Sequence, residues 1–236
     1  GIQQGSAISP LLANLFLHIA LDSWLKRTYP SLPFERFADD WLGHCHTEDE
    51  AKQILTSIQT RLQKCGLTLN QEKTKIVYCQ DDNRRNHHQH ESFDFLGFTF
   101  RSRCAKSNAG KVFRSFSPAI ANKASKEIRQ TIRQWRIHRR TVETLNSLSR
   151  LLTPVIRGWI EYYGKYYRSE IYQVLRRIDA YLIRWVCQKY KSFRRQPKRA
   201  KQWLWKVKLR EPTLFAHWVM TAVNGNTVIH EGSRMS

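Results

Sequence analysis

The chain has 236 residues, of which 41% are hydrophobic and 8 are Trp, so it can bury one ordinary core or two small ones and is not a disordered basic tail. Forty Lys and Arg against 19 Asp and Glu give a formal net charge of +21, which favours a polyanionic partner; nucleic acid is the commonest one, and a membrane surface is the alternative. No apolar run of about 18 residues and no signal peptide can be read, and the five cysteines are scattered, which argues against a membrane and against secretion and favours a bacterial cytoplasm or an organelle.

The first 100 residues, with 10 basic and 12 acidic side chains, predict alternating helices and strands. Ser9 and Pro10 are typical of a helix start, and apolar residues at helical spacing continue this helix to about Lys26. A second helix begins at the capping box Thr47–Glu50 and ends at Gly66. The other segments predict short strands, namely Phe34–Ala38, Trp41–Cys45, Leu67–Leu69, Lys75–Cys79 and a hairpin of Phe93–Phe100 with Val112–Phe116.

From about Asn122 the sequence becomes helical in its periodicity and strongly basic. Residues 101–210 hold 29 basic and 5 acidic residues, a net charge of +24. Apolar residues form three stripes at helical spacing, within residues 124–135, 145–163 and 171–185. These stripes predict a small helical bundle whose arginines and lysines face outward. After Arg210 the pattern weakens, and Asn224-Gly225 predicts a hairpin.

Asp39 and Asp40 are the clearest candidates for chemistry. Two consecutive carboxylates crowd negative charge among apolar neighbours, which is unfavourable without a counter-cation. Neighbours along a strand point to opposite faces, so both carboxylates can serve one site only at a tight turn. Mg²⁺ is usually bound by one or two carboxylates together with phosphate oxygens, and two such ions about 3.5–4 Å apart can activate a 3′-hydroxyl and stabilise the leaving group. The alternative is an ordinary Asp-Asp hairpin turn.

Four short motifs occur in an order that is typical of one family of polymerases. They are Gln4-Gly5-Ser6 with Ser9–Asn14, then Phe37–Asp40, Glu72–Lys75 and Phe95–Phe98. In this order the chain resembles reverse transcriptases, whose palm has a Gln-Gly turn and helix, an aromatic-x-Asp-Asp hairpin, a lysine motif and a Leu-Gly primer-grip hairpin. The segment Leu152–Tyr163 resembles the thumb, or X domain, of group II intron maturases, and the whole resemblance covers roughly residues 1–210.

The resemblance implies an α+β fold with a defined division. A partial palm, an antiparallel sheet with packed helices, would span residues 1–117, an α-helical thumb or maturase bundle residues 118–210, and a C-terminal tail residues 211–236. The implied activity is RNA-directed DNA polymerisation, a nucleotidyl transfer that uses Mg²⁺ and dNTP substrates on an RNA/DNA template-primer. The implied partner is intron RNA, which the protein would assist in splicing and mobility.

Roles for palm residues also follow from the resemblance. Asp39 would be the main metal ligand, and Asp40 a secondary ligand or an aid to the primer 3′ end. Either Lys73 or Lys75 would lie near the triphosphate and protonate pyrophosphate, although a solvated surface lysine explains each equally well. The nucleotide and template pocket would be lined by Gln4, Gly5, Phe37 and Lys75. The primer grip would be formed by Phe95, Leu96, Gly97 and Phe98, for which a plain core strand is the alternative.

Exposed basic side chains of the thumb are the candidates for RNA contact. Trp159 and Tyr163 of the maturase-like segment fit a helix core, which leaves Arg157 as the RNA-facing residue there. Further candidates lie off the apolar stripe or in a basic run with interleaved tryptophans: Arg176, Arg177, Arg184, Arg194, Arg195, Lys198 and Arg199. The histidines around Cys45 and in residues 87–90 lack zinc-ligand spacing and are not read as metal sites.

The sequence departs from the family pattern in ways that matter for activity. Ile2-Gln3 stands where the family usually has Thr-Pro, and Phe37 where it usually has Tyr. Because Gly1 lies inside a motif, we expect a missing N-terminal half with the fingers and the first catalytic aspartate, and a chain that is inactive on its own. One alternative is a maturase-only splicing factor with a vestigial polymerase site. Another is an unrelated basic RNA-binding protein, which would not need the ordered palm motifs.

Overall fold

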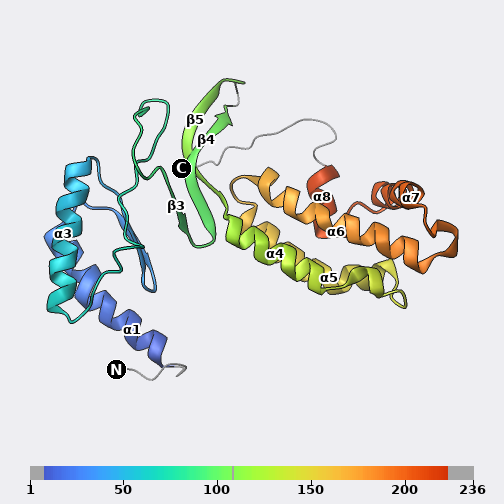
Figure 1. The fold of residues 1–236 in the computed structure, drawn as a ribbon, viewed down its shortest axis with the longest axis horizontal. Helices are drawn as coiled ribbons and strands as arrows, with labels where there is room; N and C mark the ends of the chain where they lie inside the picture. The colour runs from blue at the N-terminus through green and yellow to red at the C-terminus, as the bar shows by residue number, and fades with distance from the viewer. Residues whose placement is uncertain (1–7, 108, 223–236) are drawn as a thin grey trace. The chain divides into compact units, whose positions relative to one another are not determined.

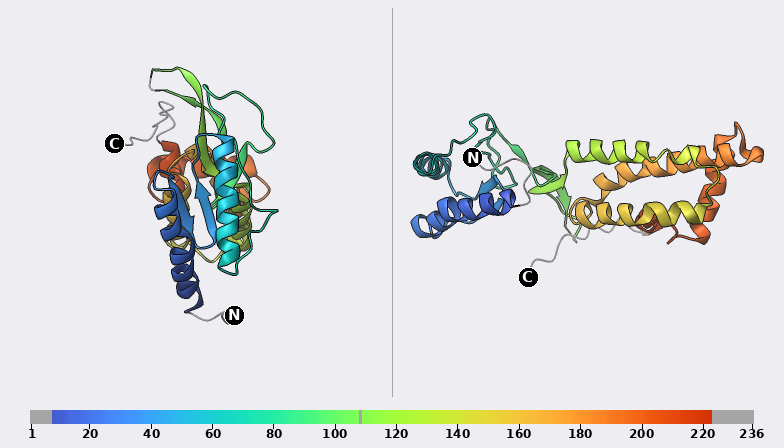
Figure 2. Two further views of the ribbon diagram at one scale, coloured as in Figure 1. Left: turned by 90° about the vertical axis from the view of Figure 1, so that its left-hand side faces the viewer. Right: turned by 90° about the horizontal axis from the view of Figure 1, so that it is seen from below.

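The computed structural model describes residues 8–107 and 109–222, which divide into two compact units (Figure 1, Figure 2). Residues up to Tyr78 together with His88–His90 form the first unit, and Cys79–His87 with the residues from Glu91 onward form the second. Each unit has its own hydrophobic core. Helices combined with small antiparallel sheets confirm the predicted α+β class. Among the described helices, none is long and apolar enough to cross a membrane.

The first unit is built from helices and a two-stranded hairpin. Helix α1 (Ser9–Leu17) continues through one π-helical turn (His18–Asp22) into α2 (Ser23–Thr28), and the hairpin of β1 (Phe34–Phe37) and β2 (Asp40–Gly43) is followed by α3 (Glu48–Lys64). Thr47 caps α3, because its hydroxyl accepts a hydrogen bond from the Glu50 amide at 3.2 Å, as the capping box predicts. The core comes mainly from the first helical segment and α3: Leu21, Leu25, Leu32, Ile54, Ile58 and Leu62.

Two features of this unit differ from what the sequence pattern suggests. The apolar stripe that runs from α1 into the π-helical turn is exposed, with Leu15 at 54% and Ile19 at 59%, so this side of the helical segment covers no core in the described residues. Residues 67–69 and 75–79 are not strands, and that prediction is wrong. A strand needs a ladder partner to satisfy its backbone, and within the described part of the chain β1 and β2 pair only with each other.

The second unit begins with a three-stranded antiparallel sheet. Its strands β3 (Ser92–Phe95), β4 (Phe98–Lys106) and β5 (Val112–Ile120) pair in the order β3-β4-β5. Residues 93–100 are therefore two strands and a turn, not the single strand of the predicted hairpin, and β4 and β5 are longer than expected. The chain reverses at Leu96 and Gly97, whose φ angles are 49° and 78°.

Helices make up the rest of the second unit. They are α4 (Asn122–Gln134), α5 (Leu145–Tyr163), α6 (Arg168–Lys189), α7 (Pro197–Arg210) and α8 (Ala216–Ala222). The three predicted stripes fall on α4, α5 and α6, and their buried members confirm the bundle: Ile132, Leu148, Ile156, Leu175, Leu182 and Trp185 are all 0% exposed. Helix α6 contacts each of the other four, so it is the centre of the bundle (Figure 1).

Residues 211–222, which the sequence assigns to a tail, pack into this bundle. Phe215, His217 and Trp218 are 0% exposed. The Asp179 carboxylate of α6 accepts hydrogen bonds from His217 Nε2 at 2.9 Å and from Trp218 Nε1 at 2.8 Å. A polar anchor therefore joins α8 to the central helix.

The structural division differs from the functional boundary predicted after residue 117. The sheet of β3, β4 and β5 belongs to the same compact unit as the helices, because β5 packs against α6 and the β3–β4 turn contacts α5. The hairpin predicted at Asn224-Gly225 lies outside the described residues.

Candidate active site and nucleic-acid interface

Asp39 and Asp40 lie at the tip of the β1–β2 hairpin. The strands pair Phe37 with Asp40, so Ala38 and Asp39 form a two-residue turn, the tight turn that two neighbouring carboxylates need in order to serve one site. Ala38 has a φ of 54°, a left-handed conformation that costs a residue with a Cβ about 1–2 kcal/mol. Both carboxylates are exposed, and across residues 8–107 and 109–222 no basic side chain forms an ion pair with either.

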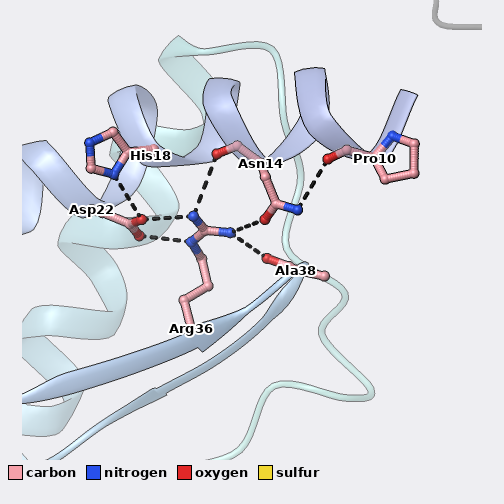
Figure 3. A network of polar contacts seen from close by, with 6 residues as sticks. All are labelled: Pro10, Asn14, His18, Asp22, Arg36 and Ala38. Atoms are coloured by element: carbon pink, nitrogen blue, oxygen red, sulfur yellow. Dashed lines mark hydrogen bonds and ion pairs between the residues drawn. The ribbon is translucent and has the colours of Figure 1, made fainter. Parts of the chain in front are cut away.

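A network of polar contacts holds the same turn (Figure 3). Arg36 of β1 donates from Nε and Nη2 to the two carboxylate oxygens of Asp22 at 2.8 and 2.7 Å. Its Nη1 donates to the Ala38 carbonyl at 2.7 Å and to Asn14 Oδ1 at 2.9 Å. Burial acts to raise the pKa of Asp22, but the hydrogen bonds and charges of Arg36 and His18 outweigh it and hold that pKa below its usual value. The Asp22–Arg36 pair is therefore ionised at neutral pH.

The turn carries the kind of ligands that a hard divalent cation takes. Two carboxylates without a basic partner among the described residues match the ligand number that Mg²⁺ usually draws from a protein when substrate phosphates and water supply the rest. Within the described residues, no three His, Cys, Asp or Glu side chains gather into a metal site. A cation at Asp39 and Asp40 would therefore need water or substrate oxygens to complete its coordination.

The remaining palm residues singled out in the sequence are distributed unevenly around this turn. Phe37 ends β1 beside the two aspartates and is 62% exposed. Lys73 and Lys75 lie in the irregular segment after α3, both exposed, and no hydrogen bond or ion pair within the described residues joins them to the carboxylates. Gln4 and Gly5 lie outside the described residues.

The predicted primer-grip residues form a tight turn that α5 holds in place. Phe95 pairs with Phe98 across the turn. The Tyr162 hydroxyl donates to the Leu96 carbonyl at 2.8 Å, and a Cβ added at Gly97 would lie only 3.0 Å from the Tyr163 hydroxyl oxygen. Phe98 is 8% exposed and packs against the rings of both tyrosines. Tyr162 and Tyr163 thus join the Leu-Gly turn to the maturase-like segment.

Sequence reasoning missed the contact that Tyr162 makes. Tyr163 continues the apolar stripe of α5, which predicts a place in the bundle core, whereas Tyr162 lies one position off that stripe and is 46% exposed. The available signal was the second tyrosine itself, since an aromatic hydroxyl at the margin of a core usually reaches a hydrogen-bond acceptor. Which acceptor it reaches depends on how the sheet packs on α5.

An open groove of about 820 Å³ runs between α4, a 3₁₀ turn (Ile137–Arg139) and α6. None of its eleven lining residues, all in the described part of the chain, is Asp or Glu. Crowded cations without acidic partners repel one another unless a polyanion is bound. Seven basic side chains line the groove: Lys126, Arg129, Arg133, Arg136, Arg139, Arg177 and Arg184.

The groove separates the predicted RNA-binding residues into two groups. Arg177 and Arg184 line it, whereas Arg157 and Arg176 are exposed but lie outside its lining. The basic run 194–199 is also exposed and lies outside it. The five basic residues of α4 and the 3₁₀ turn were not singled out in the sequence. The spacing of Lys126, Arg129 and Arg133 along the polar side of α4 was a signal, but only the packing of α4 beside α6 turns that side into a groove.

His138 and Tyr181 give the groove a polar and aromatic part. Burial and the positive charges of Arg139, Arg184 and Arg136 lower the pKa of His138, so its imidazole is neutral at pH 7. In the described part of the chain, His138 Nδ1 is buried without a hydrogen-bond partner. The Arg184 guanidinium lies 5.3 Å from the centre of the Tyr181 ring. Phosphate contact and base stacking are both available here.

Two protein-family models match this chain, one over the range of the Asp39–Asp40 turn and the other over the range of the basic groove. Residues 1–100 match the family model described as reverse transcriptase (RNA-dependent DNA polymerase), which includes the Asp39–Asp40 turn and the Leu96–Gly97 turn. Residues 125–205 match the model described as group II intron, maturase-specific domain, which includes the basic groove and Tyr162. A comparison with curated proteins gives no match.

Proposed function

Because the chain belongs to the family of group II intron-encoded reverse transcriptases and maturases, we propose that it combines RNA-directed DNA synthesis with binding of intron RNA in splicing and mobility. Synthesis is assigned to the turn of Asp39 and Asp40. Binding of intron RNA is assigned to the groove between α4 and α6. Both assignments concern this chain's own residues, and each has its own test.

The polymerase assignment rests on Asp39 and Asp40, two carboxylates on a tight turn that have no ion-pair partner among the described residues. An Asp-Asp hairpin that served only as a turn would be satisfied by local hydrogen bonds, as Asx turns are. Instead Asp39 and Asp40 are exposed, have no basic partner within the described residues, and follow a left-handed Ala38. Strain of this kind is found where a site needs a group in one place.

Asp39 and Asp40 would hold Mg²⁺, which when bound lowers the barrier to attack of a 3′-hydroxyl on a phosphate. In this proposal Asp39 is the main ligand, and Asp40 is a second ligand or orients the primer 3′ end. Lys73 or Lys75 donates a proton to the departing pyrophosphate. The Leu96–Gly97 turn, held by the Tyr162 hydroxyl at the Leu96 carbonyl, contacts the primer backbone.

The reaction also needs groups that the described residues do not supply. The family resemblance implies a third carboxylate and a fingers domain, and neither is assigned to residues 8–107 or 109–222. We therefore propose that residues 8–107 and 109–222 do not extend a primer without these groups. The partners are intron RNA, the RNA/DNA template-primer and dNTP substrates.

A second function, RNA binding without polymerisation, is favoured by one observation. The groove is lined entirely by residues of the second unit, so it needs nothing from the palm. A maturase-only splicing factor with a vestigial polymerase site would keep this groove. Polymerisation requires Asp39 as a metal ligand, whereas RNA binding alone does not. A substitution of Asp39 therefore distinguishes the two functions.

The deciding experiment is primer extension on an RNA template with Mg²⁺, using the chain joined to an N-terminal palm and fingers segment. Asp39→Ala is expected to reduce extension by at least about 100-fold, the upper end of what the loss of even an outer-shell partner costs a metal site. Affinity for intron RNA should stay unchanged. Loss of extension and RNA binding together would indicate a folding role, and absence of extension in the unchanged protein would favour the maturase-only function.

A further inference from the structure

The turn before Asp39 is held by a side chain that the metal chemistry itself does not require (Figure 3). We propose that Arg36, fixed by Asp22 and Asn14, is a positioning residue that holds the Ala38 carbonyl and thereby the carboxylates of Asp39 and Asp40. The proposal rests on the polymerase function proposed above, and its test separates the failure of one from the failure of the other.

The Arg36 guanidinium has one available orientation. Two parallel hydrogen bonds to Asp22, at 2.8 and 2.7 Å, use Nε and Nη2 in the forked geometry that planar guanidinium groups form with carboxylates. The two side chains are only 10% and 12% exposed, so water competes little for these bonds. With the fork fixed, Nη1 can point in only one direction.

That direction leads to the turn. Nη1 donates to the Ala38 carbonyl at 2.7 Å, one peptide unit before Asp39. A left-handed conformation in a residue other than glycine persists only where the surrounding structure imposes it. The bond from Arg36 supplies such a constraint on Ala38, whose φ is 54°. Loosening it would let the peptide before Asp39 rotate toward ordinary conformations and move the carboxylate.

Helix α1 and the π-helical turn supply the other half of the network. Asn14, His18 and Asp22 follow one another at intervals of four residues, so they lie along one side of the helical segment. Asn14 Nδ2 donates to the Pro10 carbonyl at 3.1 Å, which turns its Oδ1 toward Arg36 Nη1 at 2.9 Å. Helix α1 therefore buries little apolar surface but contributes polar groups that fix the turn.

A purely structural salt bridge would predict a different result from a positioning role. Removing it would lower the stability of the first unit without changing the geometry of the turn in the molecules that stay folded. The readouts must therefore be the conformational freedom of residues 37–40 and the affinity for a divalent cation, both measured on folded protein.

Arg36→Lys is the informative substitution, because it keeps a positive charge beside the buried Asp22. A single ammonium group cannot reproduce the fork to Asp22 while also reaching the Ala38 carbonyl. Mn²⁺ binding to the full chain is followed by electron paramagnetic resonance, and amide hydrogen exchange is followed at residues 37–40. Arg36→Lys should weaken Mn²⁺ affinity by about 10- to 100-fold, the usual effect of losing an outer-shell partner, and should speed exchange in the turn.

Two further variants complete the test. Arg27→Lys is the matched control, since Arg27 is exposed and its Nε donates to the Ser23 carbonyl at 3.1 Å, away from the turn; it should change neither readout. Asn14→Ala removes an exposed side chain and one acceptor of Arg36, so it should change both readouts in the same direction by a smaller factor. If Arg36→Lys does not fold, the Mn²⁺ affinity and the turn exchange of Asn14→Ala test the positioning role instead.

The outcomes are distinct. Unchanged Mn²⁺ affinity and unchanged turn exchange in Arg36→Lys, or in Asn14→Ala where that variant decides, overturn the positioning role even if the unfolding midpoint falls. Asp39→Asn tests the function beneath the proposal. If Asp39→Asn leaves Mn²⁺ binding intact, the proposed metal site is wrong, whereas faster turn exchange in Arg36→Lys would still establish that Arg36 holds the turn.

Discussion

Gly97 forms part of the β3–β4 turn and also lies against Tyr163 of α5. Its φ of 78° favours glycine, and its missing Cβ leaves room for the Tyr163 hydroxyl. Gly110 has a similar φ of 81°, but the nearest atom to a Cβ there would be the flexible end of Lys106 at 3.7 Å. The two glycines differ in their surroundings and hardly in their backbone.

We therefore expect Gly97→Ala to be more damaging than Gly110→Ala. Both variants incur the cost of a left-handed alanine, about 1–2 kcal/mol. Only Gly97→Ala also displaces Tyr163 and its neighbour Tyr162, whose hydrogen bond to Leu96 contributes about 1 kcal/mol. Urea unfolding of both variants measures the difference. Equal losses of unfolding free energy would show that the tyrosines do not hold this turn.

Asp179 makes the stability of the bundle depend on pH. Burial acts to raise its pKa, but the hydrogen bond and charge of His217, the hydrogen bond from Trp218 and the charge of Lys208 outweigh burial and lower it. A carboxyl whose pKa is lower in the folded protein stabilises the fold above its ordinary pKa of 3.8. This contribution is lost as the pH falls through the folded value.

Asp179→Asn should therefore remove about 1.5–3 kcal/mol of unfolding free energy near pH 7, the usual contribution of hydrogen bonds to a charged group. The difference between the variant and the unchanged protein should shrink as the pH falls below 3.8. Urea unfolding between pH 3 and pH 7 measures it, with the exposed Glu211→Gln as the control. A difference that stays constant over this range would contradict the ionic role of Asp179.

Among the helices, the pairing of α4 with α6 decides which of many arginines share one surface. Arg176 and Arg177 are neighbours on α6, and both are exposed. Only Arg177 lines the groove. The sequence pattern assigned RNA contact to both, together with Arg157 and Arg184. The structure instead offers Arg176 as a control of the same charge, on the same helix and one residue away.

We predict that Arg177→Gln and Arg184→Gln each weaken RNA binding, while Arg176→Gln changes it little. Each neutralised phosphate contributes about −0.7 to the slope of log affinity against log salt on single strands. Each groove variant should flatten that slope by about one contact. Binding measured over a range of salt concentrations gives both values. An equal effect of Arg176→Gln would mean that RNA affinity depends on the positive charge of the bundle in general and not on the groove.

For the whole molecule, the structure corrects where a separate RNA-binding half should be cut. A half limited to residues 118–210 would lose Phe215 and Trp218, both 0% exposed in the core of the second unit. It would also lose β3 and β4, which pack with β5 and α5. Each buried aromatic side chain contributes roughly 3–5 kcal/mol by truncation. A piece with the bounds 118–210 that the resemblance implies therefore lacks part of this core.

Residues 91–222 are expected to fold cooperatively and keep most of the RNA affinity of the full chain, with a steep dependence on salt. Residues 118–210 should unfold at a much lower temperature, and residues 1–78 should bind RNA weakly because the positive charge lies elsewhere. Thermal unfolding and RNA titration of the three pieces measure this. Binding by residues 1–78 as tight as that by residues 91–222 would refute the assignment of RNA recognition to the groove.

The sequence by itself determined the features that depend on local chemistry. Helix α3 follows from a capping box and an apolar period, α4 to α6 follow from three stripes, and the Asp39–Asp40 turn follows from two carboxylates between strand-like segments. The family also follows from the order of short motifs, as the two family matches show. The helices and the turn are properties of residues close together along the chain, and the order of the motifs is read from the sequence directly, so none of these features needed knowledge of which distant residues are in contact.

Only the tertiary structure decided which distant groups meet. The sequence contains Arg36 and Asp22, but it cannot show that the two form a forked ion pair or that Arg36 also donates to the Ala38 carbonyl. It shows basic residues on α4 and α6 but not that their packing makes one groove, and it predicted strands at residues 67–69 and 75–79 that find no ladder partner among the described residues. The physical reason is the same in each case: side-chain pairing and strand formation depend on partners far away in the sequence, which only packing brings into contact.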